Sequence, residues 1–317
     1  MDVGAIVLAG GVGSRMCPLT LDCPKPLLPL GAEPLVGYQL RRLARVGVRR
    51  VVLATGYFAH RFQDALGDGA RWNLRLLHSV EEEPLGTGGA LRAAVELLPG
   101  SERVIVVNGD LLSSHDLSGQ LAATGTADVG LHVREVADVA RYGHVMCADD
   151  GLVRGFAEKC GAGPGLANAG TYVVRADVLR SLPRGRSSWE RDILPSLIRA
   201  DARVVAWAGA GYFRDVGDPT AYRVASVDAV TGALPGSVPG SATAYVDERA
   251  AVAPGAVVQG GSSVHAGAVV GPRARLDATV LLPGSRVGAE ATLLRCVIAA
   301  GAVVPARFEA ADDVLVS

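Results

Sequence analysis

Short apolar runs alternate with amphipathic helical patterns from the start of this 317-residue chain to about Asp228. The apolar runs predict strands at residues 5–9, 51–54, 74–77 and 104–107. Between the first two, Val36, Leu40 and Leu43 recur at helical spacing, and Gly47 follows as a stop signal. Residues 88–98 predict a second helix before the last of these strands. This alternation is typical of βαβ units around a mostly parallel sheet, and it predicts an α/β fold.

Shorter strands follow within residues 129–174, where we expect an inserted portion that binds substrate. A helix at 188–200 and one more strand complete the pattern. Residues 231–244 are rich in Gly, Pro and Ser and show no periodicity, which indicates a linker. The predicted domains are therefore residues 1–230 and residues 245–317.

Beyond the linker, aliphatic residues recur at every sixth position. They are Val246, Val252, Val258, Val264, Val270 and Leu276. The period slips by one residue near Leu282, which we attribute to a turn at Pro283-Gly284, and it resumes with Val287. A hexapeptide period fits a left-handed parallel β-helix, in which three sides make one coil and each aliphatic side chain points inward. The tail has room for about three and a half coils.

The charge balance excludes several classes of partner. The 31 basic and 32 acidic residues nearly cancel, and no run of basic residues marks a surface for nucleic-acid polymers or anionic membranes. No apolar stretch reaches about 18 residues, and the start has no basic leader with a cleavage site, so we expect a cytoplasmic protein without a membrane partner. The five cysteines are widely spaced and predict neither a disulfide framework nor a zinc site.

Candidate chemistry begins where the first predicted strand ends. Residues 10–15 (GGVGSR) form a glycine-rich turn there, and the backbone N–H groups of such a turn can approach phosphates closely. A dinucleotide-binding fingerprint would need glycine in place of Met16, and a P-loop would need a Gly-Lys-Ser/Thr step that the chain lacks. Only two of the basic residues are lysines, Lys25 and Lys159, which suggests that both positions need a compact ammonium group. Asp110 ends a buried apolar strand, where a carboxylate is costly unless it binds a metal or is well hydrogen-bonded.

The segments LAGGVGSRMCPLT and CPKPLLPLG together resemble the signature of the sugar-1-phosphate nucleotidyltransferases. Further motifs follow in the order of that family: EEPLGTGGAL at 82–91, NGD at 108–110, YG at 142–143, EK at 158–159, NAG at 168–170 and FRDVGDP at 213–219. The resemblance covers residues 3 to about 228, and the hexapeptide tail is similar to that of one branch of the family. It implies a Rossmann-like mixed sheet followed by the β-helix. It also implies an enzyme that transfers a nucleotidyl group from a nucleoside triphosphate to a sugar 1-phosphate, or to a sugar-like cyclitol 1-phosphate, and releases pyrophosphate.

The resemblance assigns residues to these substrates. It makes Arg15 and Lys25 catalytic cations that act on the phosphates. It makes Asp110 and Asp215 catalytic as well, as the ligands of Mg²⁺, a hard cation that prefers oxygen. The residues implied for the nucleotide are Leu8, Gly10, Gly11, Gly13, Ser14, Glu81, Gly86, Thr87, Asn108 and Gly109. Those implied for the sugar phosphate are Tyr142, Gly143, Glu158, Lys159 and Asn168.

Two positions depart from the family's pattern. Cys160 stands where many relatives carry proline, which leaves the shape of that loop and the identity of the sugar open. Met16-Cys17 stand where relatives often have Leu-Arg, so one basic residue beside the phosphates is missing. We expect Arg15 and Lys25 to be sufficient without it.

The segment EEEPLGTG at 81–88 resembles the guanylyltransferase branch, which includes mannose-1-phosphate guanylyltransferases. One carboxylate can accept both the N1–H and the 2-amino group of guanine, whereas thymine and uracil offer a single N–H between two carbonyls. We therefore expect GTP. One of the three glutamates at 81–83 would read the base, and the alignment of the loop favours Glu81. Two alternatives stay open: a glucose-1-phosphate thymidylyl- or uridylyltransferase, and a catalytically inert regulatory subunit that binds nucleotide sugars. We also expect a homo-oligomer, because the edges of solenoids commonly mediate assembly.

Overall fold

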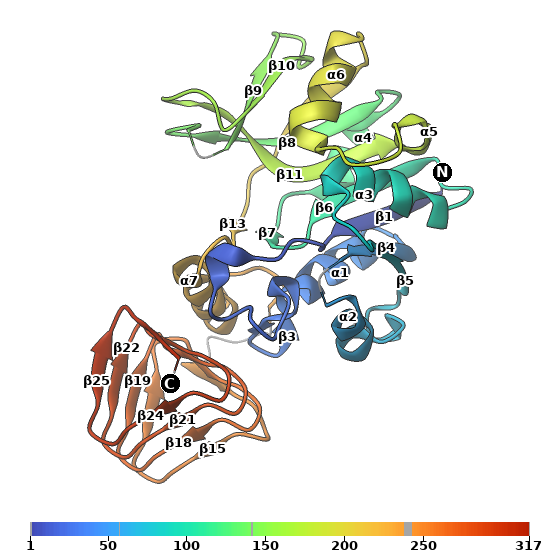
Figure 1. Ribbon diagram of the computed structural model, residues 1–317. Helices are drawn as coiled ribbons and strands as arrows, with labels where there is room; N and C mark the ends of the chain where they lie inside the picture. Colours follow the sequence, from blue (N-terminus) through green and yellow to red (C-terminus); the bar gives the residue numbers. More distant parts are fainter. Residues whose placement is uncertain (1, 57, 141, 238–242, 317) are drawn as a thin grey trace. The chain divides into compact units, whose positions relative to one another are not determined.

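The computed structural model describes residues 2–56, 58–140, 142–237 and 243–316. The chain divides into two compact units, and the blue N-terminal part of Figure 1 contributes to both. The α/β unit consists of residues 1–11 and 39–211, and the β-helix unit consists of residues 12–38 and 212–317. Part of the predicted linker, residues 238–242, lies outside the described residues. In the part of the chain that the structure describes, no helix is both long and apolar enough to cross a membrane.

A nine-stranded sheet forms the α/β unit. Its strands are β1 (Val3–Leu8), β4 (Arg50–Thr55), β5 (Arg75–Val80), β6 (Arg103–Asn108), β8 (Val129–Val136), β9 (Gly143–Cys147), β10 (Val153–Glu158), β11 (Gly165–Arg175) and β12 (Val204–Ala208). The main path runs in the order β10-β9-β11-β6-β1-β4-β5, and β8 joins β11 to β12. Because β6, β1, β4 and β5 are parallel while β11 pairs antiparallel with β6, the sheet is mixed, as predicted.

The helices of this unit pack along the sheet (Figure 1). They are α2 (Ala59–Leu66), α3 (Gly86–Ala94), α4 (Leu117–Thr124), α5 (Ala176–Ser181) and α6 (Leu194–Arg199). The unit also contains the short helical turns η3 (Ala70–Trp72) and η4 (Val95–Leu97) and the π-helix η5 (Trp189–Ile193). A short strand, β7 (Leu111–Ser113), follows β6. Helix α1 (Leu35–Arg45) contributes residues to both units. It forms where Val36, Leu40 and Leu43 place one apolar stripe on one face, and all three are fully buried.

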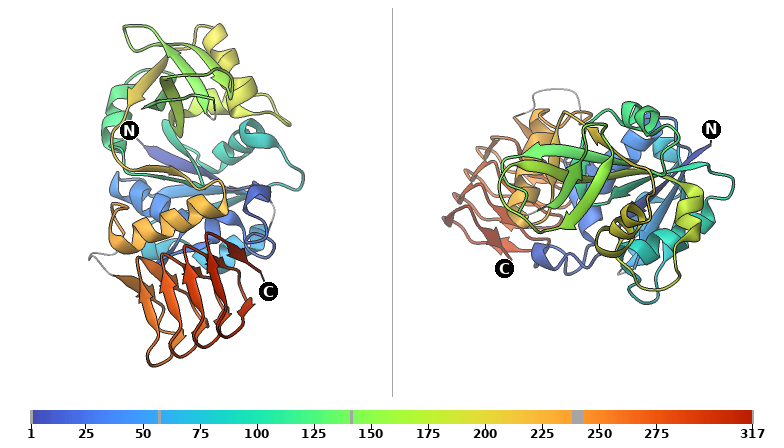
Figure 2. Two further views of the ribbon diagram at one scale, coloured as in Figure 1. Left: turned by 90° about the vertical axis from the view of Figure 1, so that its left-hand side faces the viewer. Right: turned by 90° about the horizontal axis from the view of Figure 1, so that it is seen from above.

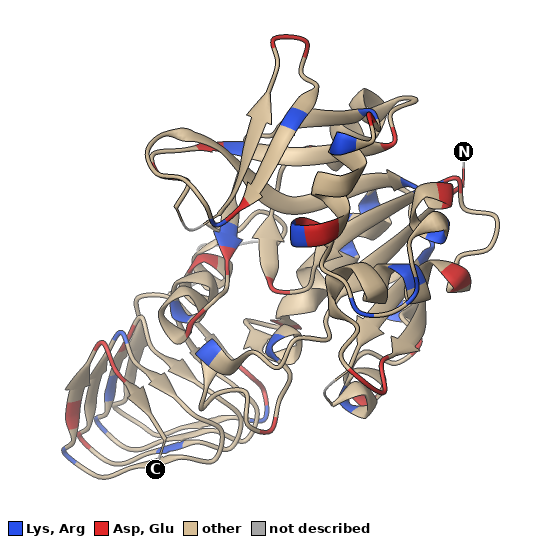
Figure 3. Cartoon of the chain, turned by 45° about the horizontal axis from the view of Figure 1, so that its top comes forward, with Lys and Arg blue, Asp and Glu red and all other residues tan. Residues whose placement is uncertain are grey.

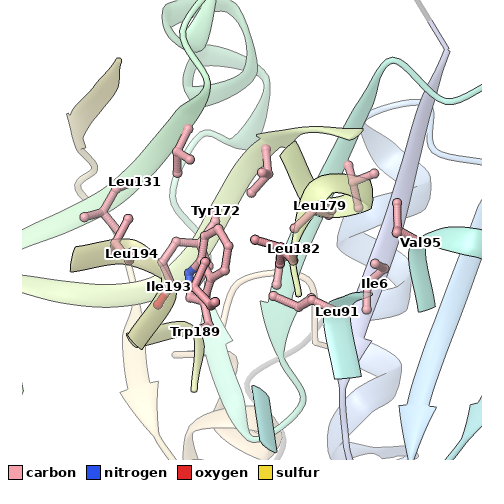
Figure 4. Packing of buried hydrophobic residues seen from close by; sticks show 14 of the residues in the cluster. Ile6, Leu91, Val95, Leu131, Tyr172, Leu179, Leu182, Trp189, Ile193 and Leu194 are labelled. Atoms are coloured by element: carbon pink, nitrogen blue, oxygen red, sulfur yellow. The ribbon is translucent and has the colours of Figure 1, made fainter. Parts of the chain in front are cut away.

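A continuous apolar core lies between the sheet and α3, α5, α6 and η5. Figure 4 shows part of this core, with Ile6 and Val95 on one side, Leu131 and Leu194 on the other, and Tyr172 and Trp189 between them. The Tyr172 and Trp189 rings meet edge to face, with centroids 5.6 Å apart. This core fixes the strands whose ends carry the predicted site residues.

The β-helix unit begins with two short helical turns and ends with a stack of short strands. Its first elements are η1 (Ser14–Met16), η2 (Lys25–Leu27), β2 (Pro29–Leu30), β3 (Glu33–Pro34), β13 (Phe213–Asp215) and α7 (Pro219–Thr231). Helix α7 starts where Asp218 caps it, with the side chain accepting a hydrogen bond from Ala221 N–H at 2.8 Å. The proline at the first helical position fits this start, because its missing N–H is not needed there.

The stacked strands form three parallel sheets, which Figure 2 shows coil upon coil in orange to red. One sheet holds β14 (Ala244–Val246), β17 (Ser262–Val264), β20 (Val280–Leu281), β23 (Val297–Ile298) and β26 (Val314–Leu315). The second holds β15 (Ala251–Val252), β18 (Val269–Val270), β21 (Arg286–Val287) and β24 (Val303–Val304). The third holds β16 (Val257–Gln259), β19 (Arg275–Asp277), β22 (Thr292–Leu294) and β25 (Glu309–Ala311). This is the predicted left-handed parallel β-helix.

The position of the phase slip differs from the prediction. Val257 pairs with Arg275 and Arg275 pairs with Thr292, so the second of these coils is one residue shorter than the first. The missing residue lies at one corner, between the third sheet and the first. The first coil has two residues there, Gly260 and Gly261, and the next coil has one, Ala278. The turn at Pro283-Gly284 is therefore not its cause. The last coil keeps the shorter length, since Thr292 pairs with Glu309.

Candidate active site

Most of the predicted nucleotide residues of the α/β unit lie where parallel strands end. Leu8 at the end of β1 stands opposite Asn108 at the end of β6, and Gly109 N–H donates to the Leu8 carbonyl at 2.8 Å. Gly10, in the turn after β1, lies beside Gly56 in the turn after β4. Ligands of open α/β sheets bind at this carboxyl edge, so the residues that follow the strands are in the appropriate place.

Glu81 directly follows β5 at the same edge. A Cβ atom on Gly10 would lie 3.7 Å from Glu81 Oε1, so the glycine turn and this carboxylate are neighbours. The other oxygen, Oε2, accepts the Leu85 N–H at 3.0 Å and thereby shapes the loop that leads into α3. Burial raises the pKa of the Glu81 carboxyl, and the Leu85 hydrogen bond opposes that rise. The structure thus distinguishes Glu81 from Glu82 and Glu83, which are exposed.

The start of α3 rests on the segment before η5. Gly86 has a φ of +69°, and a Cβ there would lie 2.5 Å from the Ser187 carbonyl oxygen, so this position requires glycine. Gly88 N–H donates to the same carbonyl at 2.8 Å, and Ser187 N–H donates to Leu85 at 2.9 Å. The sequence interpretation missed Ser187, because no motif marks it.

Glu190 is a second residue that the motifs did not mark. It lies on the π-helix η5, and its carboxylate accepts hydrogen bonds from the Thr87 hydroxyl at 2.9 Å and from the Tyr172 hydroxyl at 3.4 Å. Asn168 Nδ2 donates to Tyr172 at 2.7 Å. Burial raises the pKa of Glu190, while the bond from Thr87 opposes the rise. Glu190 therefore connects a predicted nucleotide residue, Thr87, with a predicted sugar residue, Asn168.

Four of the predicted sugar-phosphate residues gather on the hairpin of β9 and β10. Gly143 stands opposite Glu158 across this pair, and a Cβ on Gly143 would lie 2.9 Å from Glu158 Oε2. Lys159 N–H donates to the Tyr142 carbonyl at 3.1 Å, and the Lys159 ammonium lies 3.8 Å from Glu158 Oε1. Lys159 has a φ of +51° and an exposed side chain. The hairpin thus combines a cation with hydrogen-bonding groups of the kind that sugar hydroxyls need.

Asn168, the fifth sugar residue, lies at an irregularity of β11. The register of β11 against β8 shifts between Asn168 and Tyr172, and Asn168 Oδ1 accepts the Gly170 N–H at 3.0 Å. A Cβ on Gly170 would lie 3.0 Å from Asn108 Nδ2, so this bulge approaches the end of β6. Bulges of this kind often redirect side chains beside active sites.

Asp110 follows the buried strand β6 and precedes β7, and its side chain is half-buried. The next residue, Leu111, is held by its carbonyl, which accepts a hydrogen bond from Gln39 Nε2 of α1. Ser113 continues the restraint, because its hydroxyl lies 2.8 Å from His115 Nδ1. The backbone just after Asp110 is therefore tied to α1 through the Leu111 carbonyl.

The predicted catalytic cations, Arg15 and Lys25, and the second carboxylate, Asp215, belong to the β-helix unit. Gly13 has left-handed backbone geometry, and Ser14 and Arg15 follow it in η1. Lys25 is 8% exposed, and a Cβ placed on Gly13 would lie 3.4 Å from the Lys25 Cβ. The Arg15 guanidinium lies beside Gly217, where a Cβ would be 3.3 Å from Nη1. Within this unit, the glycine turn thus approaches both Lys25 and the residues just after Asp215.

Among the described residues, no group of three or more His, Cys, Asp or Glu side chains could hold a metal ion. The candidate protein ligands are instead two aspartates, Asp110 in the α/β unit and Asp215 in the β-helix unit. Each aspartate by itself offers the carboxylate oxygens that fit Mg²⁺, which is commonly bound by one or two carboxylates while water and substrate phosphates complete its coordination.

Comparisons with known proteins agree with this arrangement of motifs. Residues 4–231 match the protein family described as Nucleotidyl transferase. The chain is 37% identical over 301 residues to a mannose-1-phosphate guanylyltransferase of Mycobacterium tuberculosis, covering 93% of this chain and 84% of that protein. It is 29% identical over 309 residues to a mannose-1-phosphate guanylyltransferase of Arabidopsis thaliana, covering 93% and 85%.

A solved structure shows the same fold over most of the chain. The crystal structure of HddC from Yersinia pseudotuberculosis has a TM-score of 0.63 and 32% identity, and the match covers 71% of this chain and 98% of HddC. A second structure of HddC, in complex with GMP-PN, has a TM-score of 0.62 and 31% identity over the same shares of the two chains.

Proposed function

Because this chain belongs to the nucleotidyl transferase family, we propose that it transfers a guanylyl group from GTP to a sugar 1-phosphate, with mannose 1-phosphate as the first candidate. A phosphate oxygen of the sugar 1-phosphate attacks the α-phosphorus of GTP. The bond between the α-phosphorus and the oxygen that links it to the β-phosphorus breaks, so pyrophosphate leaves and a GDP-sugar is formed. The observation that carries the proposal is the proximity of Glu81 to the glycine turn at Gly10, at the carboxyl edge of the parallel strands, where open α/β sheets bind their ligands.

Glu81 supports guanine as the base. Leu85 holds Oε2 of this carboxylate in place, and Oε1 lies on the side of Gly10. An ionised carboxylate accepts the N1–H and 2-amino donors of guanine, but it repels the carbonyl oxygens that flank the single donor of thymine or uracil. A mismatched buried carboxylate costs about 1–3 kcal/mol, which corresponds to roughly ten- to a hundred-fold in selectivity. The guanylyltransferase names of the relatives and the GMP-PN complex of HddC agree with this choice.

The phosphates would be bound by backbone and cations together. The N–H groups of the glycine turn and the Arg15 guanidinium would neutralise the leaving pyrophosphate, and Lys25 would act on the phosphate that is transferred. Lys159, on the β9–β10 hairpin, would hold the phosphate of the incoming sugar. Asn108, Gly109 and Leu8 would support the nucleotide at the adjacent strand ends.

Asp110 and Asp215 would hold Mg²⁺, which supplies a positive charge that stabilises the negative charge on the reacting phosphates. The half-buried position of Asp110 beyond β6 and its restrained neighbours support this role. The sugar itself would be oriented by Tyr142, the Gly143 backbone, Glu158 and Asn168, which offer both donors and acceptors to its hydroxyl groups.

The direct test is a matrix of nucleoside triphosphates against sugar 1-phosphates, with pyrophosphate release as the readout. We expect GTP with mannose 1-phosphate to give the highest rate, and Asp110→Asn to abolish most of it. Turnover with dTTP or UTP and glucose 1-phosphate alone would move the chain to the thymidylyl- or uridylyltransferases. Nucleotide-sugar binding without any pyrophosphate release would instead support a regulatory subunit.

A further inference from the structure

Helix α7 carries a carboxylate that holds the strand containing Asp215. Asp228 Oδ2 accepts hydrogen bonds from the Tyr212 hydroxyl at 2.6 Å and from Arg214 Nε at 3.2 Å. Arg214 Nη2 also lies 3.0 Å from the same oxygen, and Arg214 Nε donates to the Tyr212 oxygen at 2.9 Å. Tyr212, Arg214 and Asp228 therefore form a closed set of contacts, which we call the α7 triad.

The triad determines how Asp215 is presented. Successive side chains of a strand point to opposite faces, and Asp215 is the last residue of β13. Tyr212 and Arg214 share the face that the triad holds against α7, so Asp215 points to the other face, where it is exposed. If β13 rotated about its axis, the contacts of Arg214 would break and the Asp215 carboxylate would turn in the same movement.

Helix α7 is itself a rigid support for these contacts. Tyr222 is fully buried, and its hydroxyl donates to the Pro29 carbonyl, in the segment that follows Lys25. One turn further along the helix, the Ser226 hydroxyl lies 2.9 Å from the Ser263 hydroxyl of β17, inside the first coils of the β-helix. Because α7 is anchored on both sides, Asp228 has a fixed position from which to hold the strand.

We propose that Asp228 is a positioning residue for the transfer reaction: through Tyr212 and Arg214, it fixes the direction in which Asp215 offers its carboxylate to the divalent cation. This inference rests on the proposed function. Removal of such an outer partner of a metal ligand typically weakens metal binding about 10- to 100-fold. An ion pair that merely stabilised the fold would lower Tm slightly when removed and would leave the Mg²⁺ dependence unchanged.

The chain contains a matched control of the same three residue types. In the first coil of the β-helix, Asp247 accepts hydrogen bonds from Arg249 Nε at 2.9 Å and Nη2 at 3.1 Å, and from the Tyr245 hydroxyl at 3.5 Å. The side-chain hydrogen bonds from Arg249 lower the pKa of Asp247 to about 2. None of these three residues is among the predicted site residues.

The test compares Asp228→Asn with Asp247→Asn in the full chain. For Asp228→Asn we expect the Mg²⁺ concentration that gives half-maximal turnover to rise about tenfold, while KM for GTP and for the sugar phosphate changes less than about twofold. A second readout is Tm in the presence of GTP, measured as Mg²⁺ is added, because a bound ligand raises Tm. This rise should need more Mg²⁺ in Asp228→Asn and the wild-type amount in Asp247→Asn.

Equal Mg²⁺ dependence of the two variants, in both readouts, would overturn the positioning role while leaving the proposed function intact. If the wild-type chain released no pyrophosphate, the proposed function would fail, and the Tm titration alone would judge Asp228. If Asp228→Asn did not fold, Tyr212→Phe would decide, because it keeps the ion pair and removes one donor. For Tyr212→Phe, a rise of roughly threefold in the Mg²⁺ concentration that gives half-maximal turnover supports the inference. A concentration equal to that of the wild-type chain contradicts it.

Discussion

The sheet of the α/β unit and the coils of the β-helix are both built from short parallel strands, but they use polar residues differently. In the β-helix, one corner repeats a polar position in successive coils: Thr279 N–H donates to Ser262 Oγ at 3.0 Å, and Cys296 N–H donates to Thr279 Oγ1 at 3.2 Å. In the α/β unit, polar residues such as Glu81 and Asn108 occur once each, where a strand ends at the carboxyl edge of the sheet. A polar position that repeats along the fold serves its stability, whereas one that occurs once at a strand end is available for chemistry.

Charged residues show the same contrast. On the outside of the β-helix, basic and acidic residues are interspersed (Figure 3). Glu290 accepts hydrogen bonds from Arg273 one coil before it and from Arg307 one coil after it, and Arg295 pairs with Asp312 in the same manner. These ion pairs between successive coils, which we call charge ladders, neutralise the charges on the surface of the β-helix locally. The α/β unit instead places Lys159 and Glu158 on one hairpin beside the predicted sugar site.

The largest expected effect is a loss of catalysis when the two predicted metal ligands, each of which occurs once in the fold, are replaced. Asp110→Asn and Asp215→Asn should each lower kcat at least about 10²-fold, because they remove a charge that would hold the metal on the reacting phosphates. Asp312→Asn, in a repeated ladder of the β-helix, should leave kcat unchanged. Steady-state pyrophosphate release measures all three, and a near wild-type kcat for either site variant at low Mg²⁺ would remove that residue from the site.

Acid should destabilise the α/β unit more than the β-helix. His115 and His132 are 3% and 0% exposed, with ring centroids 3.5 Å apart, and Arg42 Nη2 lies 2.8 Å from His115 Nε2. Burial, with Arg42 and His132 adding to it, lowers the pKa of His115 to about 2, and burial lowers the pKa of His132 to about 4. His265 is the corresponding imidazole of the β-helix, and burial lowers its pKa to about 4.

Because these folded-state pKa values lie below the unfolded value, the unfolded chain binds more protons, and stability falls as the pH drops below about 6.5. Each imidazole that stays neutral in the fold should cost about 2 kcal/mol between pH 6.5 and pH 5. All three tryptophans lie in the α/β unit, so urea unfolding followed by their fluorescence reports that unit. A free energy of unfolding that does not change over this range, or that rises with acid, would contradict the prediction.

The smallest expected effect is a loss of stability when a polar residue at the repeated corner of the β-helix, Thr279, is replaced. Thr279 is fully buried, and its hydroxyl accepts the Cys296 N–H and lies 2.9 Å from the Asp277 carbonyl. Thr279→Val keeps the shape but leaves these groups unpaired, which should cost about 1–2 kcal/mol of stability and leave kcat/KM unchanged. Thermal unfolding and steady-state kinetics check both statements. A loss of activity at unchanged stability would show that the coil contributes to chemistry after all.

The sequence predicted the elements whose signals are local. The apolar runs predicted β1, β4, β5 and β6, and the six-residue period predicted the β-helix, because both depend on which neighbours along the chain are buried. The period alone did not locate the shortened corner. Replacing Gly260-Gly261 by the single residue Ala278 changes the spacing without leaving an apolar signal at that point.

Residues that act through distant partners were not predictable. Glu190 meets Thr87, 103 positions earlier in the chain, and Ser187 supports the Gly86 turn, so neither pairing leaves a pattern in the sequence. Asp228 lies on α7, and no motif in the sequence of this helix marks it as the partner of Tyr212 and Arg214. The candidate site could be predicted where a family motif carries it, at Gly10 or Asp110 for example. The roles of the individual site residues stay predictions until variants test them.

The central claim is that a carboxylate at Glu81 selects guanine, and the ratio of kcat/KM for GTP to kcat/KM for dTTP, measured with one accepted sugar 1-phosphate, tests it most directly. We predict a ratio of roughly ten to a hundred for the wild-type chain, and a smaller ratio for Glu81→Gln, whose amide can donate to the carbonyls of thymine. Glu83→Gln, at an exposed position of the same segment, should keep the wild-type ratio. A wild-type value for dTTP that equals or exceeds the value for GTP would contradict the account.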